Sequence, residues 1–196
     1  VAWVYLPTLD QQGGSALTLD NLDGAFDGLV YGELAPRRWM AGSDMWHRTS
    51  KDQQHYPEES ADANTRVQIT IVYKAEMVRL FRNGQPFAQY FVDAPRAFGP
   101  ESVAVLGLRH LEAKDRACLK AAIEDARVYD RALTNEEGAQ LRPGEASAPE
   151  PWAWWSFRDG RAVDRMGRFP ESLLAGNARI EGGRLVLDGA NSYLVA

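Results

Sequence analysis

The chain has 196 residues, of which 45% are hydrophobic and 25% charged, so it has the composition of a folded domain and enough length to bury a core. Its net charge of -5 argues against nucleic acid as the main partner, because phosphate binding needs a basic surface. No apolar run is long enough to span a membrane, and a single cysteine excludes an internal disulfide.

The amino-terminal part begins with two predicted strands, at residues 1–6 and 16–19. The acidic, glycine-punctuated loop that follows carries Asp20, Asp23 and Asp27. Carboxylates at this density can bind calcium, although their spacing is not that of a helix–loop–helix calcium site. Ordinary turn chemistry, in which Asp and Asn side chains bond their own backbone, explains the loop as well. A calcium site and a simple turn therefore both stay open.

Two further strands are predicted at residues 29–34 and 38–41, and then the apolar pattern stops from 43 to 66. A connection this long in a compact domain is usually functional or disordered. Aromatic rings can stack on sugar faces, and neighbouring polar side chains can bond hydroxyls. The candidate ligand-binding residues are Trp39, Trp46, His47, Arg48 and Tyr56. Alternatively, the loop folds back on its own domain with Trp46 and Tyr56 as anchors, or a neighbouring domain covers it.

The middle of the chain carries the clearest strand signals. Apolar residues alternate with polar ones from 67 to 73, as in a half-buried strand. Residues 78–91 are predicted to form a hairpin around Asn83-Gly84, because this dipeptide tolerates the two positive φ angles of a type I′ turn. A further strand is predicted at 103–108.

A strand followed by one short helix is predicted between residues 121 and 141. Residues 121–129 favour a strand, and Thr134 and Glu137 have the spacing of a capping box. Because Gly138 weakens the helix, we expect only one or two turns near 135–141.

The carboxyl-terminal part divides into a linker and a strand-rich segment. Residues 142–151 are rich in Pro, Ala and Glu and are predicted to form a semi-rigid spacer between a domain at 1–141 and the segment 152–196. We expect residues 152–196 to complete the same domain, because a few strands with three tryptophans would otherwise expose much apolar surface. The alternative is that they begin a second domain.

Several of these segments resemble laminin-G-like domains of the concanavalin A-like lectin/glucanase superfamily. Residues 122–137 resemble the closing strand and helix of such a domain, residues 1–6 its early "AWV" strand, and residues 78–86 its central hairpin. Residues 152–157, 182–189 and 193–195 resemble strands that normally precede the "AWV" strand. The resemblance implies an all-β, two-sheet antiparallel jelly-roll sandwich, an extracellular or periplasmic location and a polysaccharide or glycan partner.

Catalytic patterns are not evident in the sequence. Glycoside hydrolysis needs two carboxyl groups at a fixed separation, and no strand carries them at adjacent same-face positions. Asp10, Glu33 and Asp44 could converge only through the fold. His47 and His55 lie eight residues apart without further zinc-ligand spacing. We therefore expect a non-catalytic module.

The leading functional hypothesis is a carbohydrate-binding or interaction module, belonging to a larger secreted bacterial glycan-processing protein. The stretch 39–59 and the order of segments also look like the accessory region of some glycoside hydrolase family 32-like proteins. Because the sequence begins and ends inside predicted strands, we expect it to be a fragment. The alternatives are a jelly-roll glycosidase or lyase with dispersed carboxylates, and a structural domain that docks on a neighbouring catalytic domain.

Overall fold

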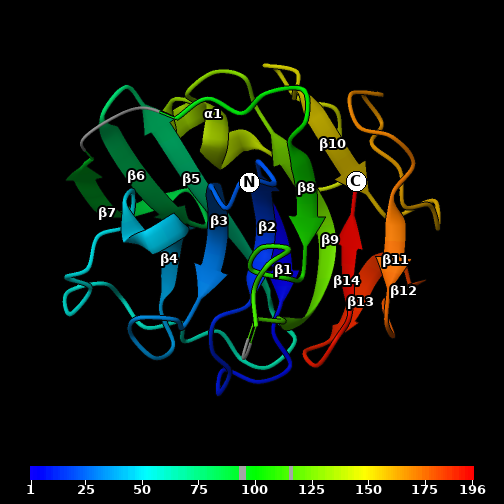
Figure 1. The fold of residues 1–196 in the computed structure, drawn as a ribbon, viewed down its shortest axis with the longest axis horizontal. Coiled ribbons are helices and arrows are strands. Elements are labelled where there is room, and N and C mark those ends of the chain that lie inside the picture. The colour runs from blue at the N-terminus through cyan, green and yellow to red at the C-terminus, as the bar shows by residue number, and fades with distance from the viewer. Residues whose placement is uncertain (93–95, 115–116) are drawn as a thin grey trace.

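The computed structural model describes residues 1–92, 96–114 and 117–196. Over these residues the chain forms two antiparallel sheets that pack face to face, with one short α-helix and one 3-10 turn beside them (Figure 1). The predicted all-β, two-sheet sandwich with one short helix is confirmed. No helix in the described part of the chain combines the length and hydrophobicity needed to cross a membrane.

The larger sheet has eight strands in the order β12-β13-β9-β1-β5-β6-β7, and β10 also pairs with β9. Their bounds are β1 Ala2–Tyr5, β5 Arg66–Lys74, β6 Met77–Arg82, β7 Gln85–Phe91, β9 Lys120–Val128, β10 Ala153–Ser156, β12 Arg179–Glu181 and β13 Arg184–Asp188.

The smaller sheet has six strands in the order β11-β14-β8-β2-β3-β4. Their bounds are β2 Ser15–Asp20, β3 Phe26–Tyr31, β4 Trp39–Ser43, β8 Val103–Leu106, β11 Leu173–Ala175 and β14 Tyr193–Val195. The 3-10 turn η1 spans Asp44–Trp46, directly after β4, and the helix α1 spans Asn135–Gln140.

Strand β9 joins the two ends of the chain within one sheet. Its residues from Ala122 to Ala126 pair with β1. The other edge of the strand is shared by β13, opposite Lys120 to Ile123, and β10, opposite Asp125 to Val128. In the smaller sheet, β14 pairs with β8 in the same antiparallel manner. Strands from residues 152–196 therefore lie in the same two sheets as strands from residues 1–141.

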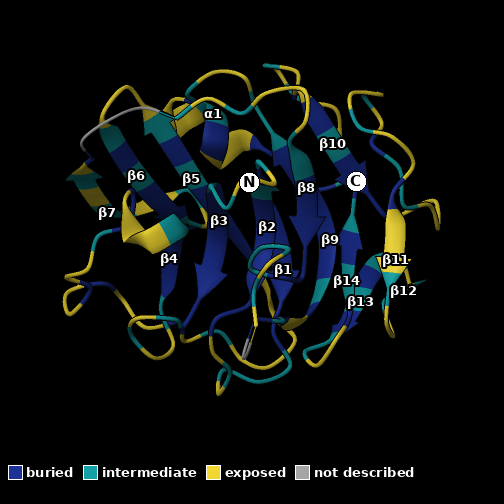
Figure 2. Cartoon of the chain, in the orientation of Figure 1, coloured by how far each residue is buried: buried dark blue, intermediate teal, exposed yellow. Residues whose placement is uncertain are grey.

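The core lies between the facing surfaces of the two sheets (Figure 2). Alternation along each strand sends every second side chain inward, which is why apolar residues two apart meet there. The largest fully buried apolar members include Tyr31, Ile69, Leu106, Ile123, Trp155, Phe157, Leu185 and Leu194. Both halves of the sequence therefore contribute to one core cluster.

The local signals at the hairpin and the helix are confirmed. Asn83 and Gly84 have φ angles of 50° and 75°, as the predicted type I′ turn requires. Gly84 is also needed sterically, because a Cβ there would lie 2.8 Å from the Cβ of Ala139 in α1. The capping box is complete: Thr134 Oγ1 accepts from the Glu137 amide at 3.2 Å, and Glu137 accepts from the Thr134 amide at 2.8 Å.

The Pro-rich segment 142–151 is tied to β9. The Arg127 guanidinium donates to the carbonyl oxygens of Arg142 and Glu145, both at 2.8 Å, and the Gly144 amide donates to Asp125 at 2.6 Å. Arg127 and Asp125 are both fully buried and bond each other at 2.8 Å. Hydrogen bonds to β9 therefore hold the start of this segment against the sandwich, whereas the composition predicted a semi-rigid spacer.

Replacing Leu185 with Ala tests whether the carboxyl-terminal strands unfold with the rest. Leu185 is fully buried opposite Ile123, so we expect Leu185→Ala to lower the free energy of unfolding by about 2–5 kcal/mol. Urea unfolding followed by far-UV circular dichroism and tryptophan fluorescence should show one coincident transition for wild type and variant. Leu174→Ala, at a 41% exposed position of β11, is the control and should change little.

A separate, earlier transition confined to part of the signal in the Leu185→Ala variant would contradict this expectation. It would mean that the carboxyl-terminal strands unfold separately from β9.

Candidate functional site

The connection between β4 and β5, residues 44–65, is anchored on its own sandwich. Tyr56 is only 3% exposed, and its ring meets Phe87 of β7 edge-on with centroids 5.7 Å apart. Thr49 donates to the carbonyl oxygen of Ala41 at 2.8 Å, and Gln53 is buried beside Met40. The hypothesis that this loop folds back therefore describes most of its length.

The strongest anchor is the carboxylate of Glu59, which is 1% exposed. It accepts from Arg82 Nε at 2.9 Å, from the Trp39 indole at 3.0 Å and from the Ala61 amide at 2.9 Å. Burial acts to raise the pKa of Glu59, but the hydrogen bonds from these donors and the charge of Arg82 outweigh it and lower the pKa below its usual value of 4.5. Glu59 is therefore an ionised, fully bonded group that fixes the loop to β4 and β6.

Three of the five candidate ligand-binding residues are buried. Trp39, Arg48 and Tyr56 are between 3% and 5% exposed. Their side chains support the loop, and the buried rings of Trp39 and Tyr56 do not offer a face on which a surface sugar could stack. Trp46 and His47 remain accessible, and Trp46 is 40% exposed. The prediction that Trp46 anchors the loop is wrong.

The turn η1 presents the accessible candidates in an uncommon backbone conformation. Met45 and Trp46 have φ angles of 45° and 57°, in the left-handed region that residues with a side chain rarely adopt. Met45 is 76% exposed, so burial of these side chains does not compensate for the conformation. Lys51 Nζ lies 5.8 Å from the Trp46 ring centroid. We call the side chains of Met45, Trp46, His47 and Lys51 the η1 platform.

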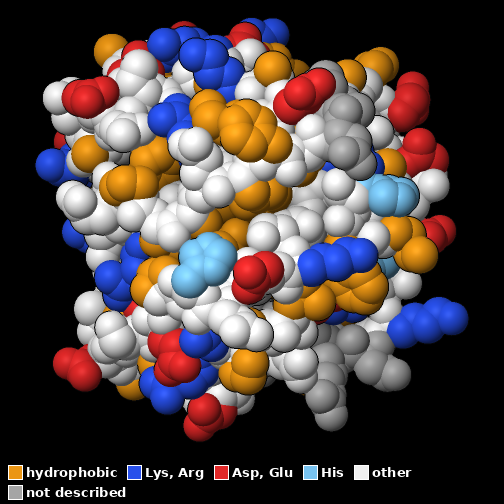
Figure 3. All heavy atoms as spheres, turned by 90° about the vertical axis from the view of Figure 1, so that its left-hand side faces the viewer, with side chains coloured by type: hydrophobic (Ala, Val, Ile, Leu, Met, Phe, Trp, Pro, Cys, Tyr) orange, Lys and Arg blue, Asp and Glu red, His pale blue; other side chains and the backbone are white. Residues whose placement is uncertain are grey.

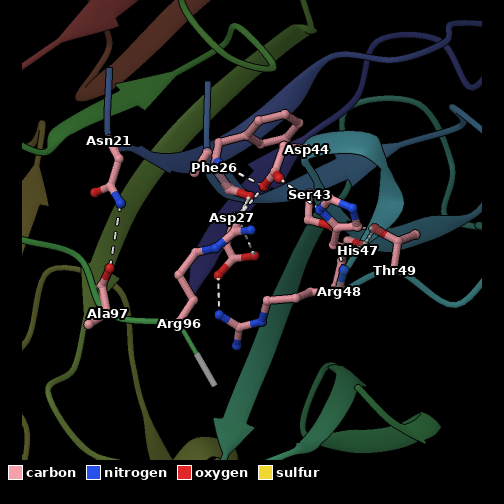
Figure 4. Close-up of polar contacts among 12 residues, drawn as sticks. Asn21, Phe26, Asp27, Ser43, Asp44, His47, Arg48, Thr49, Arg96 and Ala97 are labelled. Carbon is pink, nitrogen blue, oxygen red and sulfur yellow. Dashed lines mark hydrogen bonds and ion pairs between the residues drawn. The ribbon is translucent and has the colours of Figure 1, made fainter. Parts of the chain in front are cut away.

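A network of alternating charges adjoins η1 through Asp44 and His47 (Figure 4). Arg96 bonds Asp44 and the carbonyl oxygen of Phe26, and its Nη1 lies 3.8 Å from Asp27 Oδ1. Arg48 Nη1 bonds Asp27 at 2.8 Å, and His47 Nδ1 lies 3.1 Å from Asp44. The network joins β3, the end of β4 and the segment after β7, so it determines where η1 stands.

The two carboxylates of this network have different environments. Burial raises the pKa of Asp27 to about 7, and the charges of Arg48 and Arg96 offset that effect only in part. Burial acts in the same direction on Asp44, but its hydrogen bonds from Arg96 and His47 outweigh it and lower the pKa of Asp44. Both carboxylates contact the same Arg96 nitrogen, so no sugar-sized gap separates them as glycoside hydrolysis would require.

The other carboxylates that the fold might have gathered serve separate contacts. Glu33 pairs with Arg109 at 2.8 Å, Asp44 pairs with Arg96, and Asp10 is exposed. These three residues therefore do not form one acidic cluster.

The predicted calcium residues also serve separate roles. Asp20 accepts from the amides of Leu22 and Leu111, both at 2.9 Å, and Asp23 accepts from the Ala25 amide at 2.9 Å. Asp27 faces the two arginines described above. Within the described ranges, no three His, Cys, Asp or Glu side chains group in a way that could hold a metal ion. The structure therefore favours the turn interpretation of this loop.

A cleft of about 850 Å³ opens beside the buried end of the network. Its walls include Leu17 and Leu19 of β2, Leu29 of β3 and Ile71 of β5, so it lies between the two sheets. Arg48 and its neighbours close one end of it, and the segment 96–100 borders it. We call this space the intersheet cleft.

The edge of the sandwich that carries β7, β4 and η1 combines apolar and charged groups. Figure 3 shows hydrophobic side chains across the middle of this face, with Lys, Arg, Asp and Glu side chains around them. Phe91, at the end of β7, is 74% exposed. Such a mixed surface is typical of interaction sites.

Sequence reasoning missed Arg96 and Tyr73 as parts of this region. Arg96 stands outside any predicted strand, and no pattern indicated that it reaches β3 and η1. Asp27 was considered only as a calcium ligand. A signal for its inward position was available, because it alternates with Leu29 and Tyr31, both of which belong to the core.

Replacing Glu59 with Gln should lower the free energy of unfolding by about 2–3 kcal/mol, because Arg82 loses its buried carboxylate partner but keeps partial access to water. Glu58→Gln is a matched control, since that side chain is 54% exposed and its pair with Arg38 contributes little. Urea unfolding at pH 7 measures both. Equal effects of the two substitutions would contradict the assigned anchoring role.

The same pair of proteins gives a pH test. The pKa of Glu59 is lowered on folding, so its contribution to stability is present above pH 4.5 and is lost as pH falls through the folded-state pKa. The difference in unfolding free energy between wild type and Glu59→Gln should therefore shrink as the pH is lowered from 7 toward 3. A difference that stays constant over this range would show that folding does not lower the pKa of Glu59.

Comparison with known proteins places the chain in a family. A search of curated proteins finds no match. A family model described as the concanavalin A-like lectin/glucanases superfamily, of the laminin G type, matches residues 1–137. This range includes β1 to β9, η1 and the first turn of α1, and therefore most of both sheets. The chain belongs to the concanavalin A-like lectin/glucanases superfamily.

Proposed function

We propose that this domain is a non-catalytic carbohydrate-binding module whose contact surface is the η1 platform. The observation that carries the proposal is the exposed Trp46 ring, held in a left-handed backbone conformation on a buried ionic network. Conformations of this kind are unfavourable and persist where surrounding structure imposes them, often at binding sites. Membership of a superfamily that includes lectins supports the same function.

The chemistry of the platform suits a neutral or weakly anionic glycan. The flat face of Trp46 offers a stacking surface for the axial C–H groups of a pyranose ring. His47 and Lys51 stand beside it with hydrogen-bond donors for hydroxyl or carboxylate oxygens. A rigid backbone reduces the entropy lost on binding, so a small contact area gives measurable affinity.

The proposal of a non-catalytic role is supported by the way in which the nearby carboxylates are used. Asp27 and Asp44 share Arg96, and Glu59 is fully bonded to Arg82, Trp39 and Ala61. These bonds leave no free acid and base facing each other across a sugar. Turnover of a polysaccharide by this domain, abolished by a single Asp or Glu substitution, would favour the alternative of a jelly-roll glycosidase or lyase.

We further propose that the domain serves a larger extracellular or periplasmic glycan-processing protein. The resemblance of residues 39–59 to accessory regions of glycoside hydrolase family 32-like proteins motivates this step. Under this hypothesis a catalytic domain elsewhere in the protein cleaves the glycan that the η1 platform holds.

A second candidate is docking on a neighbouring domain of the same protein. Phe91, Met45 and Trp46 are all exposed large apolar residues, and a domain interface would bury them. Binding measurements on the isolated domain distinguish the two candidates, because a docking surface has no affinity for glycans.

The substitution Trp46→Ala tests the glycan-binding proposal. The isolated domain is screened on an array of plant and bacterial polysaccharides that includes fructans, and the best ligand is titrated by calorimetry. Loss of the stacking surface should weaken binding at least tenfold, with the melting temperature within about 1 °C of wild type, because the side chain is 40% exposed. Trp152→Ala is the matched control, at a 36% exposed position away from η1, and should keep wild-type affinity.

Equal losses in the two variants, or binding that survives Trp46→Ala, would overturn the assignment of the η1 platform. Absence of any glycan binding by the wild-type domain would leave the docking role as the supported function.

A further inference from the structure

The intersheet cleft is separate from the η1 platform and has a different character. Its walls include apolar side chains from both sheets, among them Leu17, Leu19, Leu29 and Ile71, together with charged side chains such as Arg168. Its volume of about 850 Å³ lies within the range of about 300–1,000 Å³ that is usual for small-molecule sites. A space of this size between facing sheets is uncommon, because sheet interfaces normally close to crystal-like packing.

Three polar groups at one end of the cleft lack hydrogen-bond partners within the described part of the chain. They are Asp27 Oδ1, Arg48 Nε and the Tyr73 hydroxyl, and all three atoms are buried. Asp27 and Arg48 are 7% and 5% exposed, and all three residues line the cleft. Leaving a buried polar atom unpaired is unfavourable, so a group of three calls for a partner that enters the cleft.

These three groups are close to one another. Arg48 Nη1 bonds Asp27 Oδ2 at 2.8 Å, and the Arg48 guanidinium carbon lies 4.3 Å from the centre of the Tyr73 ring. The unpartnered atoms therefore supply one acceptor, one N–H donor and one hydroxyl that can do either. A single small polar group can satisfy them only if it both accepts and donates.

The charges at this end of the cleft are already balanced. Among the described residues at this end, Arg48 is paired with Asp27 and Arg96 with Asp44, so neither guanidinium is left without a carboxylate partner for an ionic head group to replace. The Asp27 Oδ1 contact with Arg96, at 3.8 Å, is an ion pair and not a hydrogen bond. A charged ligand would have to leave water without gaining an opposite charge, which disfavours it.

We propose that the intersheet cleft is a second binding site, for a neutral amphipathic small molecule with an apolar body and a hydroxyl or primary amide head. The body lies against Leu17, Leu19 and Ile71. The head accepts from Arg48 Nε and donates to Asp27 Oδ1, with the Tyr73 hydroxyl as a third partner. This site is independent of the glycan surface, and neither proposal requires the other.

Four probes of equal chain length test the head-group assignment by isothermal titration calorimetry at pH 7.5: 1-octanol, octanamide, octanoate and octylammonium. We expect saturable one-to-one binding of 1-octanol and octanamide, at least tenfold tighter than that of the two charged probes. Equal binding of all four probes, or binding without saturation, would show only non-specific apolar association and would overturn the proposal. No detectable binding, with the cleft holding water alone, would also overturn it.

Tyr73→Phe is the informative variant, because it removes only a hydroxyl that has no hydrogen-bond partner among the described residues. It should leave the melting temperature unchanged or higher, while weakening 1-octanol binding about threefold to tenfold. Tyr193→Phe, on β14 and outside the cleft lining, is the matched control and should bind as wild type does.

A second variant removes the space itself. Leu19→Phe extends a partly buried wall residue into the cleft and should weaken 1-octanol and octanamide alike. Octanol affinity that is unchanged in both Tyr73→Phe and Leu19→Phe would place the probe elsewhere and contradict the assigned site.

Discussion

The pairing of β9 on both of its edges is the constraint on which the rest of the structure depends. One edge is taken by β1, from the beginning of the chain, and the other by β10 and β13, from its last third. A strand with a free edge exposes a row of unpaired amides and carbonyls, and here neither edge is left open along most of its length. These strands also supply core residues such as Leu185 and Trp155, so the same strands complete the sheet and fill the core.

Buried carboxylates extend this framework to segments that are not strands. Asp125 on β9 accepts from Arg127, from the Gly144 amide and from the Trp154 indole at 2.9 Å, and so joins the segment after α1 to the sheet. Glu59 does the same for the long connection between β4 and β5. Each carboxylate offers several lone pairs, so one side chain can satisfy donors from several distant parts of the chain. Irregular segments thereby gain defined positions without regular backbone pairing.

The η1 turn and the intersheet cleft share one ionic network. Asp44 and Arg96 support the exposed turn, while Asp27, Arg48 and Arg96 line the cleft, and the two carboxylates share Arg96. The network therefore connects the exposed turn with the space between the sheets. Asp27 is buried between two arginines, and this contact uses the carboxylate for structure rather than leaving it free to act as one of a hydrolytic pair.

Much of the fold could be predicted from the sequence, because its determinants are local. Alternation from 67 to 73 predicted β5, Asn83-Gly84 predicted the hairpin, and Thr134 with Glu137 predicted the start of α1; all three are confirmed. The pattern of strands and the resemblance of residues 122–137 were enough to predict a two-sheet sandwich. These features depend on a few neighbouring residues, whose conformational preferences do not need distant partners.

The candidate site could be predicted only in part. The sequence in and beside the polar stretch does not indicate whether an aromatic ring faces water or the core. The buried Trp39 and Tyr56 therefore could not be distinguished from the exposed Trp46. Trp39 is buried against Glu59, 20 residues away, and Tyr56 is buried against Phe87 of β7. The sequence by itself determined most of the strands, the hairpin turn, the helix start and the family, but not β11 or β12. Only the tertiary structure decided which aromatic side chain is exposed and which charges meet, because those outcomes depend on contacts between residues that are far apart along the chain.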